Sequence, residues 1–174
     1  MADAESIKSF IKDVPDFPKK GIIFKDITPL LAEPEAFARA VKLLAEPFKG
    51  KGIDKVIGVE SRGFLLAAPV ALELGAGLAL VRKKGKLPRE TISASYQLEY
   101  GTDTLEMHAD ALKKGEKAII IDDVLATGGT CAAVCEMARK LGGEVVCAQF
   151  LIELLFLNGR KKLAGTEVRS LISY

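Results

Sequence analysis

Apolar residues follow two alternating spacings along the chain, and each spacing predicts a different element. Continuous apolar runs of strand length occur in KVIGVE (55–60), GLALVRK (77–83), KAIIID (117–122) and EVVCAQFLI (144–152). Helical spacing of apolar side chains appears between them, in residues 34–48, 63–74 and 129–141. Apolar strands separated by helices are typical of α/β proteins, so we expect a mostly parallel, twisted sheet with helices on both faces.

The middle of the chain has a different pattern. Apolar and polar residues alternate in residues 91–98 and again in 104–108, and the turn sequence EYGTD lies between these segments. This pattern predicts a two-stranded antiparallel hairpin over about residues 90–108. Isolated hairpins are weakly stable. A hairpin that projects from a rigid sheet would therefore be a flexible lid, of the kind that enzymes use to exclude water.

Composition adds limits on organisation and partners. The chain has 174 residues without an internal repeat, low-complexity tract or linker, so we expect a single domain over residues 1–174. Its 25 lysines and arginines nearly balance its 23 acids, which leaves a net charge of +2. That balance gives no general attraction to nucleic acid or to an anionic membrane, so neither is expected as a partner. Any anion recognition must be local.

Cysteine and histidine are too few to suggest a zinc site. The cysteines are Cys131, Cys135 and Cys147, the single histidine is His108, and no set with zinc-ligand spacing can be assembled from them. Free cysteine is usually buried, so we expect reduced core or helix residues of a cytoplasmic protein. The amino-terminal segment MADAESIKSFIKDV carries acids and lysines without an apolar core and does not resemble a signal peptide.

The most lipid-like segment is GFLLAAPVALELGAGLALV, residues 63–81. Its length approaches that of a membrane-spanning helix. However, a proline, a glutamate and two glycines interrupt it. These interruptions favour a buried helix, a turn at LGAG and a buried strand over a single membrane helix.

The segment IIIDDVLATGGT, residues 119–130, combines two features that point to a ligand. Ligands of parallel sheets bind at the carboxyl ends of strands, where this segment places Asp122 and Asp123. The turn ATGGT then opens a helix, whose amino-terminal amides could hold a phosphate. A tight strand-to-helix turn with Thr130 as the N-cap is the structural alternative. Two acids that can accept hydrogen bonds from vicinal hydroxyls, next to a phosphate site, together suggest a ribose 5-phosphate ligand.

The same segment resembles the phosphoribosyl pyrophosphate (PRPP) motif of the type I phosphoribosyltransferases. The resemblance to the adenine phosphoribosyltransferases extends over nearly the whole chain, through PDFPKKGIIFKDITPLL, VIGVESRGFLLAAPVALELG, VRKKGKLPRETISASYQLEYGTD and LIEL. It implies the type I phosphoribosyltransferase fold and the transfer of ribose 5-phosphate from PRPP to N9 of adenine, a purine salvage reaction that gives AMP and pyrophosphate. It also implies a Mg²⁺ ion bound through the substrate, without direct protein ligands.

The resemblance assigns residues to both phosphate-bearing parts of PRPP. The turn ESRG, whose first peptide bond is cis in the family, would hold the leaving pyrophosphate together with the basic segment RKKGKLP. The pyrophosphate contacts implied in this way are Glu60, Ser61, Arg62, Arg82, Lys83 and Lys86. The contacts implied for ribose 5-phosphate are Asp122, Asp123, Ala126, Thr127, Gly128, Gly129 and Thr130. Catalytically, Arg62 would stabilise negative charge on the leaving group. Taken alone, these basic turns also fit ordinary solvated loops.

The resemblance also places the adenine base. Phe24 and Leu154 would lie on either side of the ring, and backbone groups near Ile23 and Lys25 would contact its amino edge. Core packing is the alternative role for Phe24.

Two residues in the turn of the predicted lid are also implied to take part in catalysis. Glu99 would protonate or polarise N7 of the base as N9 attacks, and Tyr100 would help to close the site. Acid catalysis by Glu99 requires that lid closure raise its pKa. A polar turn exposed to solvent is the alternative interpretation.

Two other functions remain open at this point. The base could be hypoxanthine, xanthine or orotate, because only the resemblance favours adenine. A regulator that senses PRPP and binds nucleic acid is a less favoured alternative, because the chain has neither a basic patch nor an added DNA-binding module. The resemblance further implies a homodimer, in which Arg82 lies near the active site of the partner subunit.

Overall fold

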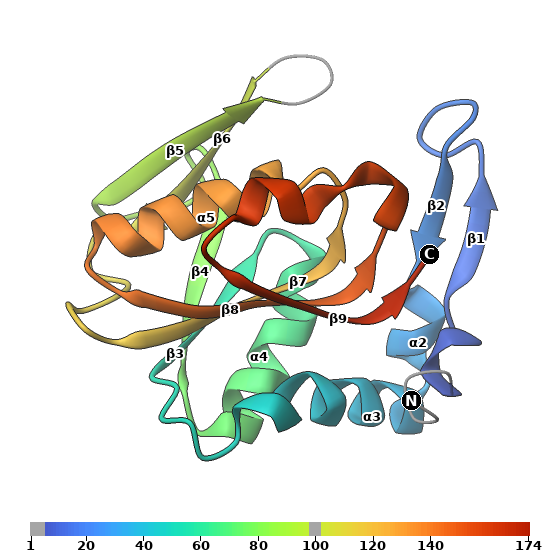
Figure 1. Cartoon of the computed structure of the whole chain (residues 1–174), viewed down its shortest axis with the longest axis horizontal. Coiled ribbons are helices and arrows are strands. Elements are labelled where there is room, and N and C mark those ends of the chain that lie inside the picture. Colours follow the sequence, from blue (N-terminus) through green and yellow to red (C-terminus); the bar gives the residue numbers. More distant parts are fainter. Residues whose placement is uncertain (1–5, 98–101) are drawn as a thin grey trace.

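A seven-stranded sheet forms the centre of the molecule (Figure 1). The computed structural model describes residues 6–97 and 102–174. The strand order is β5-β6-β4-β3-β7-β8-β9. The strands are β3 (Lys55–Val59), β4 (Gly77–Lys83), β5 (Thr91–Gln97), β6 (Thr102–His108), β7 (Lys117–Leu125), β8 (Glu144–Glu153) and β9 (Glu167–Ser173). The pairs β4–β3, β3–β7, β7–β8 and β8–β9 are parallel, so the expected mostly parallel sheet is confirmed.

Helices cover both faces of this sheet, and alternate residues of β7 show why. Ile119 and Ile121 pack into one apolar cluster with residues of α3 and α4, whereas Ile120 packs into a second cluster with residues of α5. All three isoleucines are fully buried. The helices are α2 (Thr28–Ala32), α3 (Pro34–Ala45), α4 (Arg62–Leu74) and α5 (Gly129–Lys140), and the 3₁₀ helices are η1 (Glu46–Phe48), η2 (Leu155–Leu157) and η3 (Gly159–Leu163). A strand buried on both faces must be apolar on both, which explains its continuous apolar run.

The predicted hairpin corresponds to β5 and β6. These strands pair antiparallel from Thr91↔His108 to Gln97↔Thr102, and β6 joins the edge of β4. Figure 1 shows the two strands extending beyond the body of the sheet. The turn between them lies outside the described residues, so the role of the hairpin as a lid stays a prediction.

The structure differs from the sequence prediction in two places. The apolar run predicts that the third parallel strand ends at Asp122, but β7 continues through both acids to Leu125, because β8 runs beside it and pairs with it as far as Leu125↔Glu153. The pattern also does not predict the small antiparallel sheet of β1 (Lys12–Pro15) and β2 (Ile23–Asp26). These strands are too short to show a periodicity.

The lipid-like segment 63–81 divides as predicted. It forms most of α4, a left-handed turn at Gly75 (φ 64°) and the first part of β4. Among the described residues, no helix has both the length and the apolarity needed to cross a membrane. The three cysteines are free and buried, also as predicted.

Candidate active site

The carboxyl ends of β3, β4 and β7 meet at one edge of the sheet and open a cavity of about 510 Å³. This location follows from the parallel pairing of the three strands. The residues that line it are Glu60, Ser61, Arg62, Lys83, Tyr96, Leu105, Asp122, Asp123 and Thr130. The structure therefore brings together predicted pyrophosphate and ribose contacts that are far apart in the sequence.

The two acids of β7 have different partners. Asp123 is buried, and its Oδ2 accepts a hydrogen bond of 2.5 Å from Nε of Arg62. Asp122 Oδ1 accepts a hydrogen bond from the backbone amide of Asp123, at 2.9 Å. Burial, and next the negative charge of Asp123, raise the pKa of Asp122 well above its ordinary value. The free site thus favours a proton on Asp122, while Asp123 is paired with Arg62.

Arg62 connects the acids to the predicted base contacts. It begins α4, and its guanidinium carbon lies 4.7 Å from the ring centroid of Phe24. An arginine over an aromatic face is held by a cation–π interaction as well as by its ion pair with Asp123. Arg62 therefore lies between the two acids of β7, which are the predicted ribose contacts, and Phe24 of β2.

Glu60 organises the basic turn after β4. Its carboxylate accepts hydrogen bonds from the Lys83 amide (2.9 Å) and from Nε and Nη2 of Arg82 (3.3 and 3.2 Å). Burial alone would raise the pKa of Glu60, but the Lys83 amide and the Arg82 guanidinium bring this pKa below its ordinary value. The Glu60–Ser61 peptide bond is cis, as the resemblance implies. In the free protein the Glu60 carboxylate is thus directed at the turn.

The basic turn itself is folded around Arg82. Arg82 Nη1 donates to the carbonyl of Lys86 (3.1 Å), whose own amide donates to the carbonyl of Lys83 (3.2 Å). Of the three predicted contacts in this turn, Arg82, Lys83 and Lys86, only Lys83 lines the cavity, as Arg62 of α4 also does. Its Nζ lies 3.8 Å from Asp103 on β6, so β6 and the pyrophosphate side of the cavity are neighbours.

The predicted phosphate loop lies directly beside this cavity. Ala126, Thr127, Gly128 and Thr130 line a smaller hollow of about 70 Å³ that also contacts Asp122. The N-cap of α5 is Gly128 in a left-handed conformation (φ 79°), and no side chain caps that terminus within the described part of the chain. The alternative with Thr130 as N-cap is therefore wrong. Gly129, the first residue of α5, is buried, and the amides of this first turn can bind an anion.

The predicted base contacts lie on both faces of β2. Ile23, Lys25 and Leu154 line a third cavity of about 320 Å³, whose other lining residues are Gly21, Ile22, Phe156, Leu157 and Tyr174. Phe24 has the opposite orientation, since neighbouring residues of a strand point to opposite faces. Its ring packs against Arg62 and, edge to face, against Phe17 at 5.1 Å between centroids. Three of the four predicted base contacts, Ile23, Lys25 and Leu154, therefore lie together, and Phe24 lies nearer the cavity that contains Arg62.

The two predicted catalytic residues of the hairpin turn, Glu99 and Tyr100, lie outside the described residues. Tyr96, by contrast, lines the main cavity although the sequence pattern placed it only on the apolar side of a strand. Its Oη donates to Asp103 at 3.5 Å, and burial raises its pKa. Only its side-chain type, an amphipathic tyrosine next to a predicted lid turn, could have identified it.

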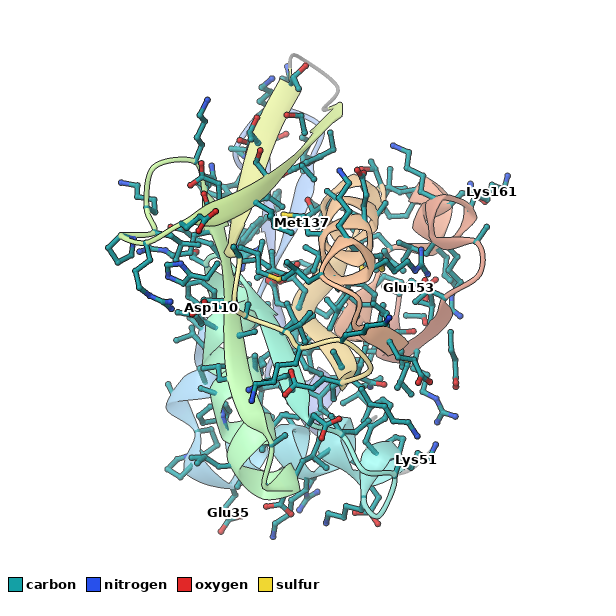
Figure 2. All side chains as sticks on the ribbon, turned by 90° about the vertical axis from the view of Figure 1, so that its left-hand side faces the viewer. Glu35, Lys51, Asp110, Met137, Glu153 and Lys161 are labelled. Atoms are coloured by element: carbon teal, nitrogen blue, oxygen red, sulfur yellow. The ribbon has the colours of Figure 1, made fainter. Side chains whose placement is uncertain are left out.

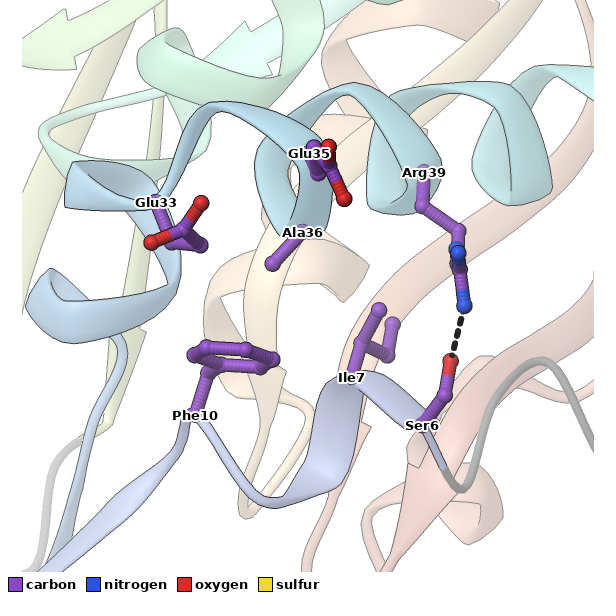
Figure 3. Close-up of a pocket in the computed structure, with 7 residues that line it drawn as sticks. All are labelled: Ser6, Ile7, Phe10, Glu33, Glu35, Ala36 and Arg39. Atoms are coloured by element: carbon purple, nitrogen blue, oxygen red, sulfur yellow. Dashed lines mark hydrogen bonds between the residues drawn. The ribbon is translucent and has the colours of Figure 1, made fainter.

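A further cavity lies apart from this edge of the sheet. It has a volume of about 230 Å³ and is bounded by α3 and the amino-terminal segment (Figure 3). Arg39 donates a hydrogen bond to Ser6 across it, at 2.8 Å. In Figure 1, α3 lies at the opposite end of the molecule from β5 and β6, and this cavity shares no lining residue with the candidate site.

Comparisons with known proteins agree with the geometry. The pattern of the phosphoribosyl transferase domain matches residues 26–167. An adenine phosphoribosyltransferase of Geobacter metallireducens is 62% identical over 98% of this chain and 99% of the relative. The crystal structure of adenine phosphoribosyltransferase from Thermoanaerobacter pseudethanolicus is 51% identical, with a TM-score of 0.95 over 98% of this chain and 99% of that one. The Saccharomyces cerevisiae enzyme, crystallised with an imino-altritol bisphosphate and adenine, is 41% identical, with a TM-score of 0.92 over 98% of each chain.

Proposed function

This chain belongs to the phosphoribosyltransferase family, and we propose that it transfers ribose 5-phosphate from PRPP to N9 of adenine, forming AMP and pyrophosphate. One observation carries the proposal. Two carboxylates, an arginine and an open helix terminus converge on neighbouring cavities at the carboxyl edge of the sheet. The preference for adenine over other bases is supported by relatives named adenine phosphoribosyltransferase, which match this chain over nearly their whole length.

The site separates charges as this reaction requires. The transition state carries positive charge on the ribose and negative charge on the leaving pyrophosphate. Asp122 and Asp123 would stabilise the first, and Arg62 with Lys83 would stabilise the second. Arg82 and Lys86 would support the turn that presents Lys83, and Arg82 would have to release Glu60 before its side chain could bind the pyrophosphate.

The 5-phosphate would occupy the phosphate loop. The amides of residues 127–130 and the hydroxyls of Thr127 and Thr130 supply donors, and the helix dipole of α5 favours an anion there. Asp122 lines both the main cavity and the smaller hollow at the phosphate loop. A ribose bound by Asp122 would therefore direct its 5-phosphate towards that loop. The order of donors and acceptors along the site thus matches the order of groups in ribose 5-phosphate.

Mg²⁺ fits this site as an ion that enters with the substrate. Among the described residues, no group of three or more histidine, cysteine, aspartate and glutamate side chains could hold a metal ion, and Asp123 is already paired with Arg62. Oxygens of the ribose and pyrophosphate would hold the ion, with Asp122 and Asp123 nearby. When bound, Mg²⁺ supplies neutralising charge to the pyrophosphate.

Base binding involves β2 and the segment after β8. We assign the backbone near Ile23 and Lys25, and the side chains of Phe24 and Leu154, to adenine on the basis of the resemblance. The cavity shared by Ile23, Lys25 and Leu154 supplies an apolar surface beside this region. Nζ of Lys25 donates to Asp13 on β1 at 2.6 Å and lies 3.7 Å from the ring centroid of Tyr174, so this side chain connects β2 to β1 and to Tyr174.

Closure of the hairpin and general acid catalysis complete the proposal. Glu99 would polarise N7 and Tyr100 would cover the site while the base attacks. The substitution Glu99→Gln tests the acid role, because it preserves the size and hydrogen bonding of the side chain but cannot deliver a proton. Turnover reduced by about 100-fold is expected. Full turnover in the variant would remove Glu99 from the mechanism.

We also propose that the protein is a homodimer. Leu65 and Leu72 on α4, and Leu78 and Leu80 on β4, are exposed apolar residues on two neighbouring elements, with Leu72 83% exposed. Exposed apolar side chains grouped in this way are typical of protein interfaces. Because Arg82 follows Leu80 on the same strand, pairing through this face would place Arg82 close to the partner, as the resemblance implies.

Purine salvage by such an enzyme belongs in the cytoplasm. Its substrate PRPP and its product AMP are strongly charged, so they do not cross the apolar part of a membrane unaided. The free, buried state of Cys131, Cys135 and Cys147 is also typical of a reducing compartment.

The assay that tests the function compares bases. Purified protein is incubated with PRPP and Mg²⁺ and, in separate reactions, with adenine, hypoxanthine, xanthine, guanine or orotate, and nucleotides are identified by mass spectrometry. We expect AMP from adenine and at most traces of the other nucleotides. Turnover with another base would overturn the specificity, and binding of PRPP without any turnover would favour the regulatory alternative.

A further inference from the structure

The phosphate loop rests on the backbone of another segment. A Cβ atom built on Gly128 would lie 2.3 Å from the carbonyl oxygen of Gly159, and one built on Gly159 would lie 2.3 Å from the carbonyl oxygen of Ala126. Real Cβ atoms do not approach so closely, so the two backbones are in direct contact without side chains between them. Gly159, at the start of η3, is buried and forms the surface beneath the loop.

The residue after Gly159 fixes that surface to the sheet. Arg160 makes a two-pronged ion pair with Glu153, in which Nε donates to Oε1 and Nη2 donates to Oε2, both at 2.6 Å. Its Nη1 also donates to the carbonyl of Val168 on β9, at 2.8 Å. Bidentate pairs of this kind fix orientation as well as distance. The chain at Gly159 is thus tied to two strands through one side chain.

Glu153 is a rigid attachment point. Its side chain is 4% exposed, and Oε2 also accepts a 2.6 Å hydrogen bond from Ser170. The hydrogen bond from Arg160 is the largest cause that lowers the pKa of Glu153. Glu153 ends β8 and lies opposite Leu125, the last residue before the phosphate loop. Figure 2 shows Glu153 on the same side of the molecule as Lys161 of η3 and away from Asp110 beyond the hairpin.

We propose that Arg160 and Glu153 are positioning residues for the reaction, which hold Gly159 beneath the loop of residues 126–130 so that its amides are set for the 5-phosphate. This inference rests on the proposed function. Neither side chain lines the sugar-phosphate cavities, so neither touches the substrate. Their effect passes through the backbone contact of Gly159 with Ala126 and Gly128.

The inference predicts a selective defect. Displacement of the loop weakens recognition of the 5-phosphate, but it leaves the pyrophosphate turn at Glu60–Gly63 in place, because that turn belongs to β3 and α4. A role limited to stability would lower the melting temperature and leave ligand affinities of the folded protein unchanged. The two roles therefore differ in the dissociation constant of ribose 5-phosphate.

The sharpest variant is Gly159→Ala. Gly159 does not have a positive φ, so alanine is allowed by its backbone, and the nearest atoms that the added Cβ would press on are the Ala126 carbonyl oxygen and the Leu125 side chain. Gly77→Ala is the matched control, because its Cβ would meet only the end of the Lys55 side chain at the other end of β4. We expect ribose 5-phosphate binding, measured by calorimetry, to weaken by at least about tenfold in Gly159→Ala and to stay unchanged in Gly77→Ala.

A second pair of variants tests the ion pair itself. Arg160→Lys keeps the charge but loses the bidentate geometry, whereas Arg169→Lys alters an exposed pair with Glu167 on β9 that does not reach the loop. In the folded proteins at 25 °C, we expect the KM for PRPP to rise about tenfold in Arg160→Lys, with the KM for adenine unchanged, and no change in Arg169→Lys.

The outcomes separate this inference from the proposed function. Equal affinity for ribose 5-phosphate in wild type, Gly159→Ala and Arg160→Lys would overturn the positioning role and leave the function intact. If wild type binds neither ribose 5-phosphate nor PRPP, the proposed function fails, and the inference fails with it. A rise in KM that is the same for PRPP and adenine would also contradict the positioning role.

Discussion

At the scale of single residues, Asp122 shows how function and stability oppose each other in this site. Its carboxylate lies next to Asp123 at a partly enclosed strand end, and both burial and that neighbour raise its pKa. Under the proposed function, the negative charge of Asp122, which is unfavourable in the free protein, would become favourable when a ribose with developing positive charge lies against it.

The substitution Asp122→Asn separates these two effects. It preserves the hydrogen bond accepted from the Asp123 amide and removes the unfavourable charge. Because the folded pKa of Asp122 is raised, the folded protein holds a proton more tightly than the unfolded chain, and stability falls as pH rises from the ordinary aspartate pKa of about 3.9 through the raised pKa of the folded protein. We expect the variant to melt about 3 °C higher at pH 7 but at the wild-type temperature below about pH 3.5, with kcat/KM about 100-fold lower. A variant that is less stable at pH 7 would contradict this account.

Part of the site could be predicted residue by residue, and part could not. Asp122, Asp123 and the glycine turn stand in one continuous segment, so their chemistry is visible in the sequence. The pairing of Glu60 with Arg82 joins residues 22 positions apart and depends on the parallel contact of β3 with β4. Tyr96 shares the alternation of its strand, and its position in the cavity became visible only once β5 was placed beside α5.

At the scale of elements, the close approach of α4 to β7 holds the two halves of the site together. A Cβ atom at Gly63, in the first turn of α4, would lie 2.7 Å from Oδ1 of Asp122 and 3.0 Å from the carbonyl of Ile121. Glycine at this position lets the helix that carries Arg62 approach the strand that carries the acids. The 2.5 Å hydrogen bond from Arg62 to Asp123 depends on this approach.

Gly63→Ala tests the approach of α4. The added methyl group must push α4 away from β7, so we expect a loss of about 2 kcal/mol in the free energy of unfolding and at least a 10-fold fall in kcat/KM for PRPP. Denaturant unfolding and initial rates measure the two effects. Gly77→Ala controls for the general effect of a methyl group on the sheet. Full activity in Gly63→Ala would show that the contact between α4 and β7 does not position the site.

Element boundaries show why some of the fold escaped prediction. The buried strands and their covering helices follow from apolar periodicity, which is strong over their lengths. The end of β7 does not follow from this periodicity. Two adjacent charged residues such as Asp122 and Asp123 usually mark the end of a strand, but here pairing with β8 extends the strand to Leu125. The pair β1 and β2 is stabilised by contacts between strands, such as Lys25 with Asp13, that no local pattern reveals.

At the scale of the whole molecule, the exposed leucines of β4, Leu78 and Leu80, stand on the same strand as Arg82, where the basic turn begins. If two copies pair through this face, subunit contact and substrate binding share β4. An enzyme built in this way would lose activity on dissociation, because the turn at the end of β4 would lose its support from the partner.

Leu72→Glu is the variant that tests the pairing. Leu72 is 83% exposed, so a charge there costs little in a monomer but would be buried in the proposed interface. We expect light scattering to give the mass of a dimer for wild type and of a monomer for Leu72→Glu. Leu155→Glu, at an exposed leucine of η2 rather than of α4 or β4, should remain dimeric. Equal masses for wild type and Leu72→Glu would exclude this face as the interface.

The most direct measurement is a crystal structure of the protein with PRPP and Mg²⁺ in the absence of a base, so that no transfer occurs. We predict the 5-phosphate on the amides of residues 127–130, the ribose hydroxyls within hydrogen-bonding distance of Asp122 or Asp123, and the pyrophosphate beside Arg62 and Lys83. PRPP bound in the reverse direction, or away from the carboxyl edge of the sheet, would contradict the assignment of these residues and the mechanism built on them.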